Sequence, residues 1–191
     1  MDILPVCVGY KATLCMSVMD LENDRWPEGY FDVIWASCPC TEWSRAKSTG
    51  TRDTEGASAL VKKTLALIRA LKPKYYFLEN PASGNLKHEE YMAGIPYADV
   101  SYCRYTIATA TDWGYRKNTR IWTNALDVWK PRPLCAKDCL NMGLNERGRW
   151  VHLRSAQKGP SRGAAQDICF STFQLYRLPP DLILEILRAV S

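Results

Sequence analysis

A short apolar run that stops at a Pro-Cys pair constrains the fold more than any other part of the sequence. Val33–Ala36 are apolar, and the chain then passes through Pro39 and Cys40. Such a run predicts a buried strand of a parallel sheet, with Cys40 on the loop beyond the strand's carboxyl end, where ligands and reactive groups collect. Because Pro39 fixes the backbone next to the thiol, we interpret Cys40 as a candidate nucleophile. The alternative is a small buried packing residue.

The composition is typical of one globular domain inside the cell. The chain has 191 residues, 47% of them hydrophobic, and it lacks both a membrane-spanning apolar run and the features of a signal peptide. We therefore expect an intracellular protein of the cytoplasm, nucleoid or nucleus that does not contact membranes. The eight cysteines are then expected to be thiols, metal ligands or a catalytic residue. A net charge of +5 with seven Trp and ten Tyr favours an acidic partner such as nucleic acid.

The pattern on both sides of Cys40 predicts a unit of strand, helix and strand. The expected elements are strands over Thr13–Met19, Phe31–Ala36 and Tyr75–Leu78, and a helix from Glu55 to Leu71. The last of these strands runs into the polar tripeptide Glu79–Pro81, which we expect to form a loop. Because parallel strands end at the same sheet edge, Cys40 and Glu79 should lie side by side.

The second half of the chain is expected to be less regular until its last helix. Further strands are predicted over Val100–Thr106 and Arg120–Thr123. From Asn124 to Phe170 the composition changes to Pro, Gly, Cys, Lys and Arg with little periodicity, which indicates an irregular inserted module. Leu182–Val190 predicts a helix that packs on the sheet, with proline and aspartate at its start. The expected domains are a core over 1–123, a module over 124–173 and a C-terminal helix over 174–191.

Cys40 and Glu79 together suit attack on an electron-poor ring. A thiolate that adds to a ring carbon needs a nearby acid to protonate the ring nitrogen as negative charge builds there. Glu79 precedes the amide of Asn80 and the stiff Pro81, which would hold it for that task. The alternative for Glu79 is a cap of the following turn.

Four motifs, in order, resemble those of the DNA (cytosine-5) methyltransferases. Pro39–Ser44 resembles the family's Pro-Cys-x-x-x-Ser nucleophile motif, and Glu79–Pro81 resembles its Glu-Asn-Val element. The segment ending in Arg120 is similar to the Gln-x-Arg-x-Arg segment, with Asn118 in place of the first arginine. The final helix is similar to the family's last element. The resemblance implies an α/β fold with a Rossmann-like class I methyltransferase sheet and a small irregular insertion.

The resemblance also implies methylation of cytosine carbon 5 in DNA, with S-adenosylmethionine as the cofactor. The base would be flipped out of the duplex. Cys40 would attack ring carbon 6, Glu79 would contact N3 and the exocyclic amine, and Arg120 would hold the base or its phosphate. The implied substrate contacts are Ser44, Asn80, Arg116 and Lys117, and the implied cofactor contacts are Asp2, Asp20 and Pro39.

The family's glycine-rich Phe-x-Gly-x-Gly loop, which holds the methionine part of the cofactor, is absent from this sequence. We therefore expect an N-terminally truncated sheet that a second polypeptide completes, or a degenerate member that binds cofactor poorly. Two other functions remain open. One is a catalytically inactive or split relative that binds DNA or a partner subunit, and the other is an enzyme that acts on RNA or nucleotides.

The irregular module carries a candidate zinc site. Cys135 and Cys139 are followed thirteen residues later by His152, and such a set can staple a segment too short to bury a core. The fourth ligand would be Cys103 or Cys169, and ordinary free thiols are the alternative. The module also stands in the place of the family's target-recognition region. Its candidate phosphate contacts, with a solvated loop as the alternative, are Arg147, Arg149, Arg154, Lys158 and Arg162.

Overall fold

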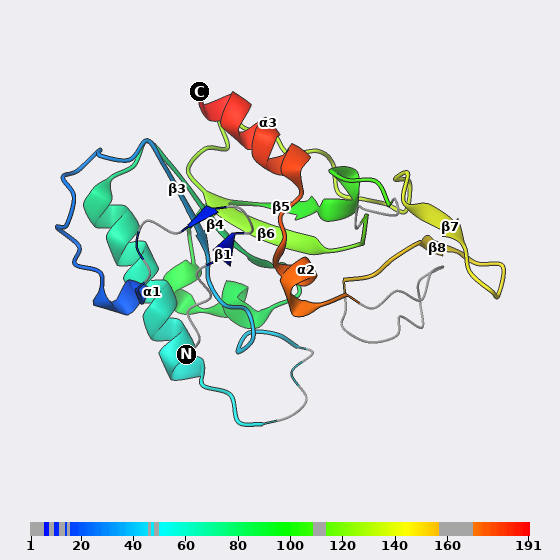
Figure 1. The fold of residues 1–191 in the computed structure, drawn as a ribbon, viewed down its shortest axis with the longest axis horizontal. Helices are drawn as coiled ribbons and strands as arrows, with labels where there is room; N and C mark the ends of the chain where they lie inside the picture. The colour runs from blue at the N-terminus through cyan, green and yellow to red at the C-terminus, as the bar shows by residue number, and fades with distance from the viewer. Residues whose placement is uncertain are drawn as a thin grey trace.

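A four-stranded mixed sheet forms the centre of the computed structural model (Figure 1). The structure describes residues 6–7, 10–11, 14, 16–45, 47, 50–108, 114–156 and 170–191. The strands are β3 (Val33–Ser37), β4 (Tyr75–Pro81), β5 (Tyr97–Ser101) and β6 (Asn118–Thr123). Their order is β3-β4-β6-β5, with β3 parallel to β4 and β6 antiparallel to both of its neighbours. The expected α/β architecture is therefore present, as a sheet of mixed strand direction.

Helix α1 (Thr54–Leu71) connects the two parallel strands. It begins where the Asp53 carboxylate accepts a hydrogen bond from the Gly56 backbone N–H at 2.8 Å, which satisfies one of the free donors of the first turn. It ends at Lys72, whose left-handed backbone conformation closes the last turn. The helix predicted from Glu55 to Leu71 is confirmed, and it starts one residue earlier.

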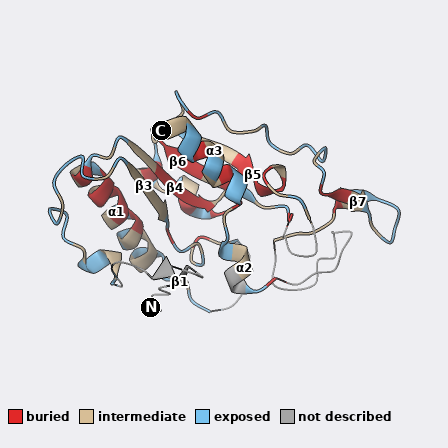
Figure 2. Cartoon of the chain, turned by 45° about the horizontal axis from the view of Figure 1, so that its top comes forward, coloured by how far each residue is buried: buried red, intermediate tan, exposed pale blue. Residues whose placement is uncertain are grey.

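The sheet is covered on both faces, and each face has its own core. One face packs against α3 (Pro180–Val190) and the other against α1. Figure 2 shows buried residues gathered in β4, β6 and α1. The core toward α3 includes Phe77, Ile121, Tyr102, Trp129, Leu182 and Ile186. The core toward α1 includes Leu78, Trp122, Trp43, Val61 and Leu65.

Shorter elements surround the sheet. Two-stranded pairs are formed by β1 (Val6–Cys7) with β2 (Tyr10–Lys11) and by β7 (Met142–Leu144) with β8 (Trp150–His152). The short helices are η1 (Val18–Asp20), η2 (Asn85–His88), η3 (Glu90–Met92), η4 (Tyr102–Arg104) and α2 (Thr172–Tyr176). In the described part of the chain, no helix has both the length and the apolar character needed to cross a membrane.

Three expectations about the elements need correction. Glu79–Pro81 is not a loop, because β6 pairs with β4 as far as Pro81 and keeps the tripeptide extended. The strand expected over Val100–Thr106 lies earlier, over Tyr97–Ser101, and continues as η4. The strand expected over Thr13–Met19 falls partly outside the described residues, and its end is the 3-10 helix η1.

Leu182→Ala should lower the free energy of unfolding by about 2–5 kcal/mol, because Leu182 is fully buried between α3 and the sheet. Leu184 lies on the same helix and is 47% exposed, so Leu184→Ala should change stability by less than about 0.5 kcal/mol. Urea unfolding of the two variants measures both values. Equal losses would contradict the packing of α3 described above.

Candidate active site

Cys40 lies on the wall of a cavity at the end of β3. The cavity has a volume of about 830 Å³ and is bounded by Cys40, Pro81 and Leu175 among others. We call it the Cys40 cavity. Its hydroxyl-bearing and cationic lining residues are Thr41, Ser44, Lys47, Ser83, Arg116 and Lys117. A half-buried thiol surrounded by cations and hydroxyls suits a polar, negatively charged ligand.

A hydrogen bond from Asn80 fixes the loop that carries Cys40. The Asn80 side chain is fully buried and its amide nitrogen donates to the Cys38 carbonyl oxygen at 3.0 Å. On the other side of the thiol, the Trp43 backbone N–H donates to the Cys40 carbonyl oxygen at 3.1 Å. Trp43 is itself buried against α1. Hydrogen bonds on both sides of Cys40 therefore fix the short segment that carries the thiol.

Glu79 lies beside Cys40 and is held by two groups. In the parallel pairing Ser37 faces Glu79, which puts the carboxylate next to the loop that follows Ser37. Glu79 is buried, and its Oε1 accepts a hydrogen bond from the Tyr102 hydroxyl at 3.0 Å. The Lys117 ammonium lies 3.7 Å from the same oxygen. A buried carboxylate with a cation and a donor beside it has a fixed orientation.

Lys117 is itself fixed by three contacts. Its ammonium donates to the Leu175 carbonyl oxygen at 3.2 Å, lies 4.8 Å from the centroid of the Tyr102 ring and pairs with Glu79. Because Lys117 also lines the Cys40 cavity, one cation links the carboxylate to the cavity. Tyr102 could not be predicted from the sequence, since only the fold brings its hydroxyl to Glu79.

Burial and the charges around Cys40 together set its ionisation. Burial raises the pKa of the Cys40 thiol above its ordinary value, the Lys117 cation lowers it, and the negative charge of Glu79 raises it. The net direction is upward, so the thiol is mainly protonated at neutral pH. Burial also raises the pKa of the Tyr102 hydroxyl, with Glu79 adding to the effect. Tyr102 therefore remains a hydrogen-bond donor.

Of the five residues predicted to contact the substrate, three line the Cys40 cavity and two do not. Ser44, Arg116 and Lys117 line the Cys40 cavity with Cys40. Arg120 instead makes a two-pronged ion pair with Asp99, at 2.7 and 2.9 Å, and Asn80 is buried under the loop.

The reason is the alternation of side chains along strands. Asn80 and Arg120 face each other in the β4–β6 register and lie on the α1 side of the sheet. Glu79, one residue before Asn80, lies on the α3 side. Asn80 thus positions the loop, and Lys117 lines the Cys40 cavity whereas Arg120 pairs with Asp99. The substrate contacts of Arg120 and Asn80 stay predictions.

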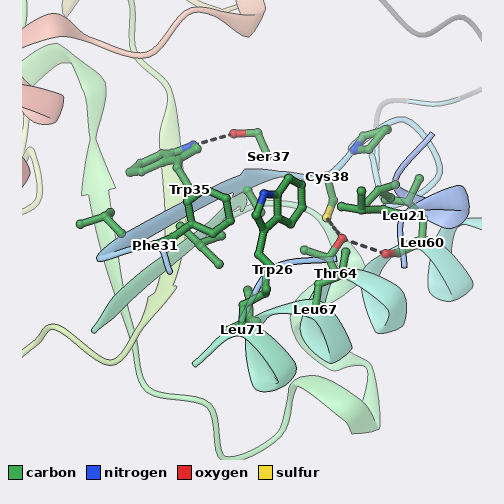
Figure 3. A pocket seen from close by; sticks show the side chains of 16 residues that line it. Leu21, Trp26, Phe31, Trp35, Ser37, Cys38, Leu60, Thr64, Leu67 and Leu71 are labelled. Atoms are coloured by element: carbon green, nitrogen blue, oxygen red, sulfur yellow. Dashed lines mark hydrogen bonds between the residues drawn. The ribbon is translucent and has the colours of Figure 1, made fainter. Parts of the chain in front are cut away.

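Pro39, one of the three predicted cofactor contacts, lines a second, mainly apolar cavity between β3, η1 and α1, which we call the β3–α1 cleft (Figure 3). Its volume is about 570 Å³, and its lining includes Trp26, Phe31 and Pro39. Asp20 is exposed in η1, and its neighbour Leu21 lines the cleft. Asp2 lies outside the described residues. Ser37, Cys38 and Pro39 line the β3–α1 cleft, whereas Cys40 lines the other cavity.

The predicted zinc ligands also meet. Cys103, Cys135, Cys139 and His152 have ligand atoms that all lie within 4.8 Å of one another. Among the residues that the structure describes, Cys103 is the fourth member of the group; Cys169 lies outside them. Of the predicted phosphate contacts, Arg147 and Arg149 are exposed between β7 and β8, and Arg154 is half-buried. Lys158 and Arg162 lie outside the described residues.

Lys117→Met and Glu79→Gln should shift the pKa of Cys40 in opposite directions. Loss of the cation removes a charge that stabilises the thiolate, so the pKa rises. Loss of the carboxylate removes a charge that destabilises it, so the pKa falls. The rate of Cys40 alkylation by iodoacetamide against pH, followed by peptide mass spectrometry, measures both shifts. Lys72→Met, at an exposed lysine paired with Glu28, is the control and should leave the profile unchanged; parallel shifts in the two test variants would contradict this electrostatic description.

Two comparisons with known proteins agree with the motifs and the fold. Residues 10–110 match the family described as C-5 cytosine-specific DNA methylase. A protein of Frog virus 3 (isolate Goorha), named probable DNA (cytosine-5)-methyltransferase, is 35% identical over 173 residues, which cover 82% of this chain and 74% of that protein. The first match includes Cys40 and Glu79. The chain therefore belongs to the C-5 cytosine-specific DNA methylase family.

Proposed function

We propose that this chain methylates carbon 5 of cytosine in DNA, with S-adenosylmethionine as methyl donor and Cys40 as covalent nucleophile. Family membership supports DNA cytosine methylation in general. The observation that carries the covalent step is Cys40 on the wall of a cationic cavity, with the buried Glu79 close enough to influence its ionisation. The parallel β3–β4 pair joined by α1 also supports our inference of a Rossmann-like class I methyltransferase sheet.

In the proposed reaction the residues of this chain act on the base. The Cys40 thiol gives its proton to the Glu79 carboxylate, the sulfur forms a bond to ring carbon 6, and Glu79 passes the proton on to N3. Electron density then collects on carbon 5. S-adenosylmethionine, when bound, would supply an electrophilic methyl group to carbon 5 and leave as S-adenosylhomocysteine. Carbon 5 loses its proton to water, the bond from carbon 6 to sulfur breaks, and N3 returns its proton to Glu79. Cys40 leaves as thiolate, and the product is 5-methylcytosine.

The Cys40 cavity has the size and lining for a flipped nucleotide. Its volume of about 830 Å³ lies within the range of small-ligand sites. Flipping costs a few kcal/mol, and contacts of Arg116 and Lys117 with the phosphate or base would offset that cost. We assign Arg147 and Arg149, exposed on the β7–β8 turn, to phosphate contacts outside the cavity. The module over 124–173 would then lie along the DNA beside the core.

The β3–α1 cleft fits the adenosyl part of the cofactor. Aromatic rings of Trp26 and Phe31 line it, in edge contact at 5.2 Å between centroids, and flat apolar surfaces of this kind bind purine rings. Pro39 lines this cleft and Cys40 the neighbouring cavity. A donor in the cleft and a base in the cavity would therefore meet across the Pro39-Cys40 pair.

DNA that contains 5-fluorocytosine should trap the proposed intermediate. Fluorine cannot leave carbon 5 as a proton does, so a covalent complex should accumulate with S-adenosylmethionine present and survive denaturing electrophoresis. Cys40→Ser should abolish the complex, and the same duplex with ordinary cytosine is the control. A complex that persists at full yield in Cys40→Ser would refute Cys40 as the nucleophile.

Trp26→Ala should weaken binding of S-adenosylhomocysteine by about tenfold, which corresponds to about 1.4 kcal/mol, because it removes an aromatic wall of the β3–α1 cleft. Trp150 is 57% exposed on β8, so Trp150→Ala should bind like the native chain. Isothermal titration calorimetry measures the three affinities. No detectable binding by the native chain would favour the catalytically inactive, DNA-binding or partner-binding alternative.

A further inference from the structure

Four soft metal ligands from three separate segments meet beyond the end of β5. Cys103 lies in η4, directly after β5, whereas Cys135 and Cys139 lie on the segment that leads from β6 to β7. His152 is the last residue of β8. The β7–β8 hairpin projects beyond the main sheet (Figure 1). Residues far apart in the sequence therefore place three sulfurs and one imidazole around a single point.

The spacing of these atoms matches a tetrahedral zinc site. Zinc–sulfur bonds of about 2.3 Å and a zinc–nitrogen bond of about 2.0 Å, at tetrahedral angles, separate sulfur from nitrogen by about 3.5 Å. The His152 Nε2 atom lies 3.5 Å from the Cys103 sulfur and 3.3 Å from the Cys135 sulfur. All four ligand atoms lie within 4.8 Å of one another. An ion fits between them with little movement of the side chains.

We propose that Cys103, Cys135, Cys139 and His152 bind one structural zinc ion. Four protein ligands complete the tetrahedral set and leave no position for water, which distinguishes a structural site from a catalytic one. Three thiolates and one imidazole form a soft donor set that suits zinc and does not suit magnesium or calcium. The site is distinct from the Cys40 cavity, since none of its ligands lines that cavity.

The segment that holds the ion has almost no core of its own. From Lys130 to Ala156, a range described throughout, the only buried residues are Asn141, Met142 and His152. The apolar residues Leu140, Leu144 and Trp150 are exposed. Two strands of three residues each cannot hold such a segment by hydrophobic burial. A metal ion supplies the missing free energy, as in other small metal-bound modules.

Hydrogen bonds fix the backbone around the four proposed ligands. The fully buried Asn141 amide nitrogen donates to the Cys103 carbonyl oxygen at 2.8 Å and to the Thr106 carbonyl oxygen at 2.7 Å. The Cys135 backbone N–H donates to the Ser101 hydroxyl at 3.1 Å. These bonds tie the module to the end of β5 on both sides of the ligands. Supporting contacts of this kind orient metal ligands and raise affinity.

The ion would also stabilise a part of the candidate active site. Tyr102 immediately precedes Cys103 in η4, and its hydroxyl donates to Glu79. Holding Cys103 therefore restrains the turn that places the Tyr102 ring. This consequence rests on the proposed function, whereas the zinc site itself does not.

Metal content tests the site directly. The native chain is produced with zinc in the medium and dialysed against metal-free buffer. Inductively coupled plasma mass spectrometry should then find one zinc ion per chain. X-ray absorption at the zinc edge should show three sulfur ligands and one nitrogen. Cobalt substitution should give the intense visible bands of a tetrahedral thiolate site. Native protein that holds no stoichiometric zinc, even after titration with zinc, would overturn the proposal.

Variants separate binding at these four residues from binding elsewhere. Cys139→Ser and His152→Ala should lose the zinc, whereas His152→Cys should keep one ion with a changed cobalt spectrum, because it restores a fourth ligand. Cys40→Ser removes a thiol outside the cluster and is the matched control for metal content. Full zinc content in both Cys139→Ser and His152→Ala, or a disulfide between Cys135 and Cys139 in the native chain, would refute the site.

Discussion

The hydrogen bond from Asn80 to the carbonyl oxygen of Cys38 is the contact on which the candidate active site depends. It joins β4 to the loop after β3 in a fully buried position, at 3.0 Å. Removing one partner of such a bond leaves a buried polar group unpaired, at a cost of about 1–3 kcal/mol. Because Cys40 lies two residues beyond Cys38 and Glu79 directly precedes Asn80, the same bond sets the spacing of the thiol and the carboxylate.

Residues on the two faces of the sheet fix different parts of the candidate active site. On the α1 side, Asn80 and the buried Trp43 hold the loop from below. On the α3 side, Tyr102 and Lys117 hold the Glu79 carboxylate. Gly84 keeps the turn after β4 tight, because a Cβ there would lie 3.1 Å from the Pro81 carbonyl oxygen. Residues on both faces of the sheet therefore fix the Cys40 loop and the Glu79 carboxylate beside the Cys40 cavity.

Local patterns were enough to predict the elements that carry the site. The helical spacing of apolar residues predicts α1, and the rule that parallel strands end at one edge predicts that Cys40 and Glu79 lie side by side. The placement of Arg120, Asn80 and Tyr102 could not be predicted in the same way. It depends on the register between β4, β6 and β5, and a shift of one residue moves a side chain to the opposite face.

Prediction of the zinc ligands from the sequence was limited in the same way. The Cys135, Cys139 and His152 spacing indicates a metal site, but the choice between Cys103 and Cys169 needs the turn of η4 that brings Cys103 to the others. A long-range contact also explains why Glu79–Pro81 is part of a strand. Its polar residues are typical of a loop, and only the antiparallel partner β6 keeps them extended.

We propose that the pairing of β3 with β4 assembles Cys40 and Glu79 into one reacting pair. Digestion of DNA to nucleosides after incubation with the chain and S-adenosylmethionine, followed by mass spectrometry, tests it most directly. The pairing predicts 5-methyldeoxycytidine with the native chain and none with either Cys40→Ser or Glu79→Gln. Undiminished formation of 5-methyldeoxycytidine by the Cys40→Ser variant would contradict it.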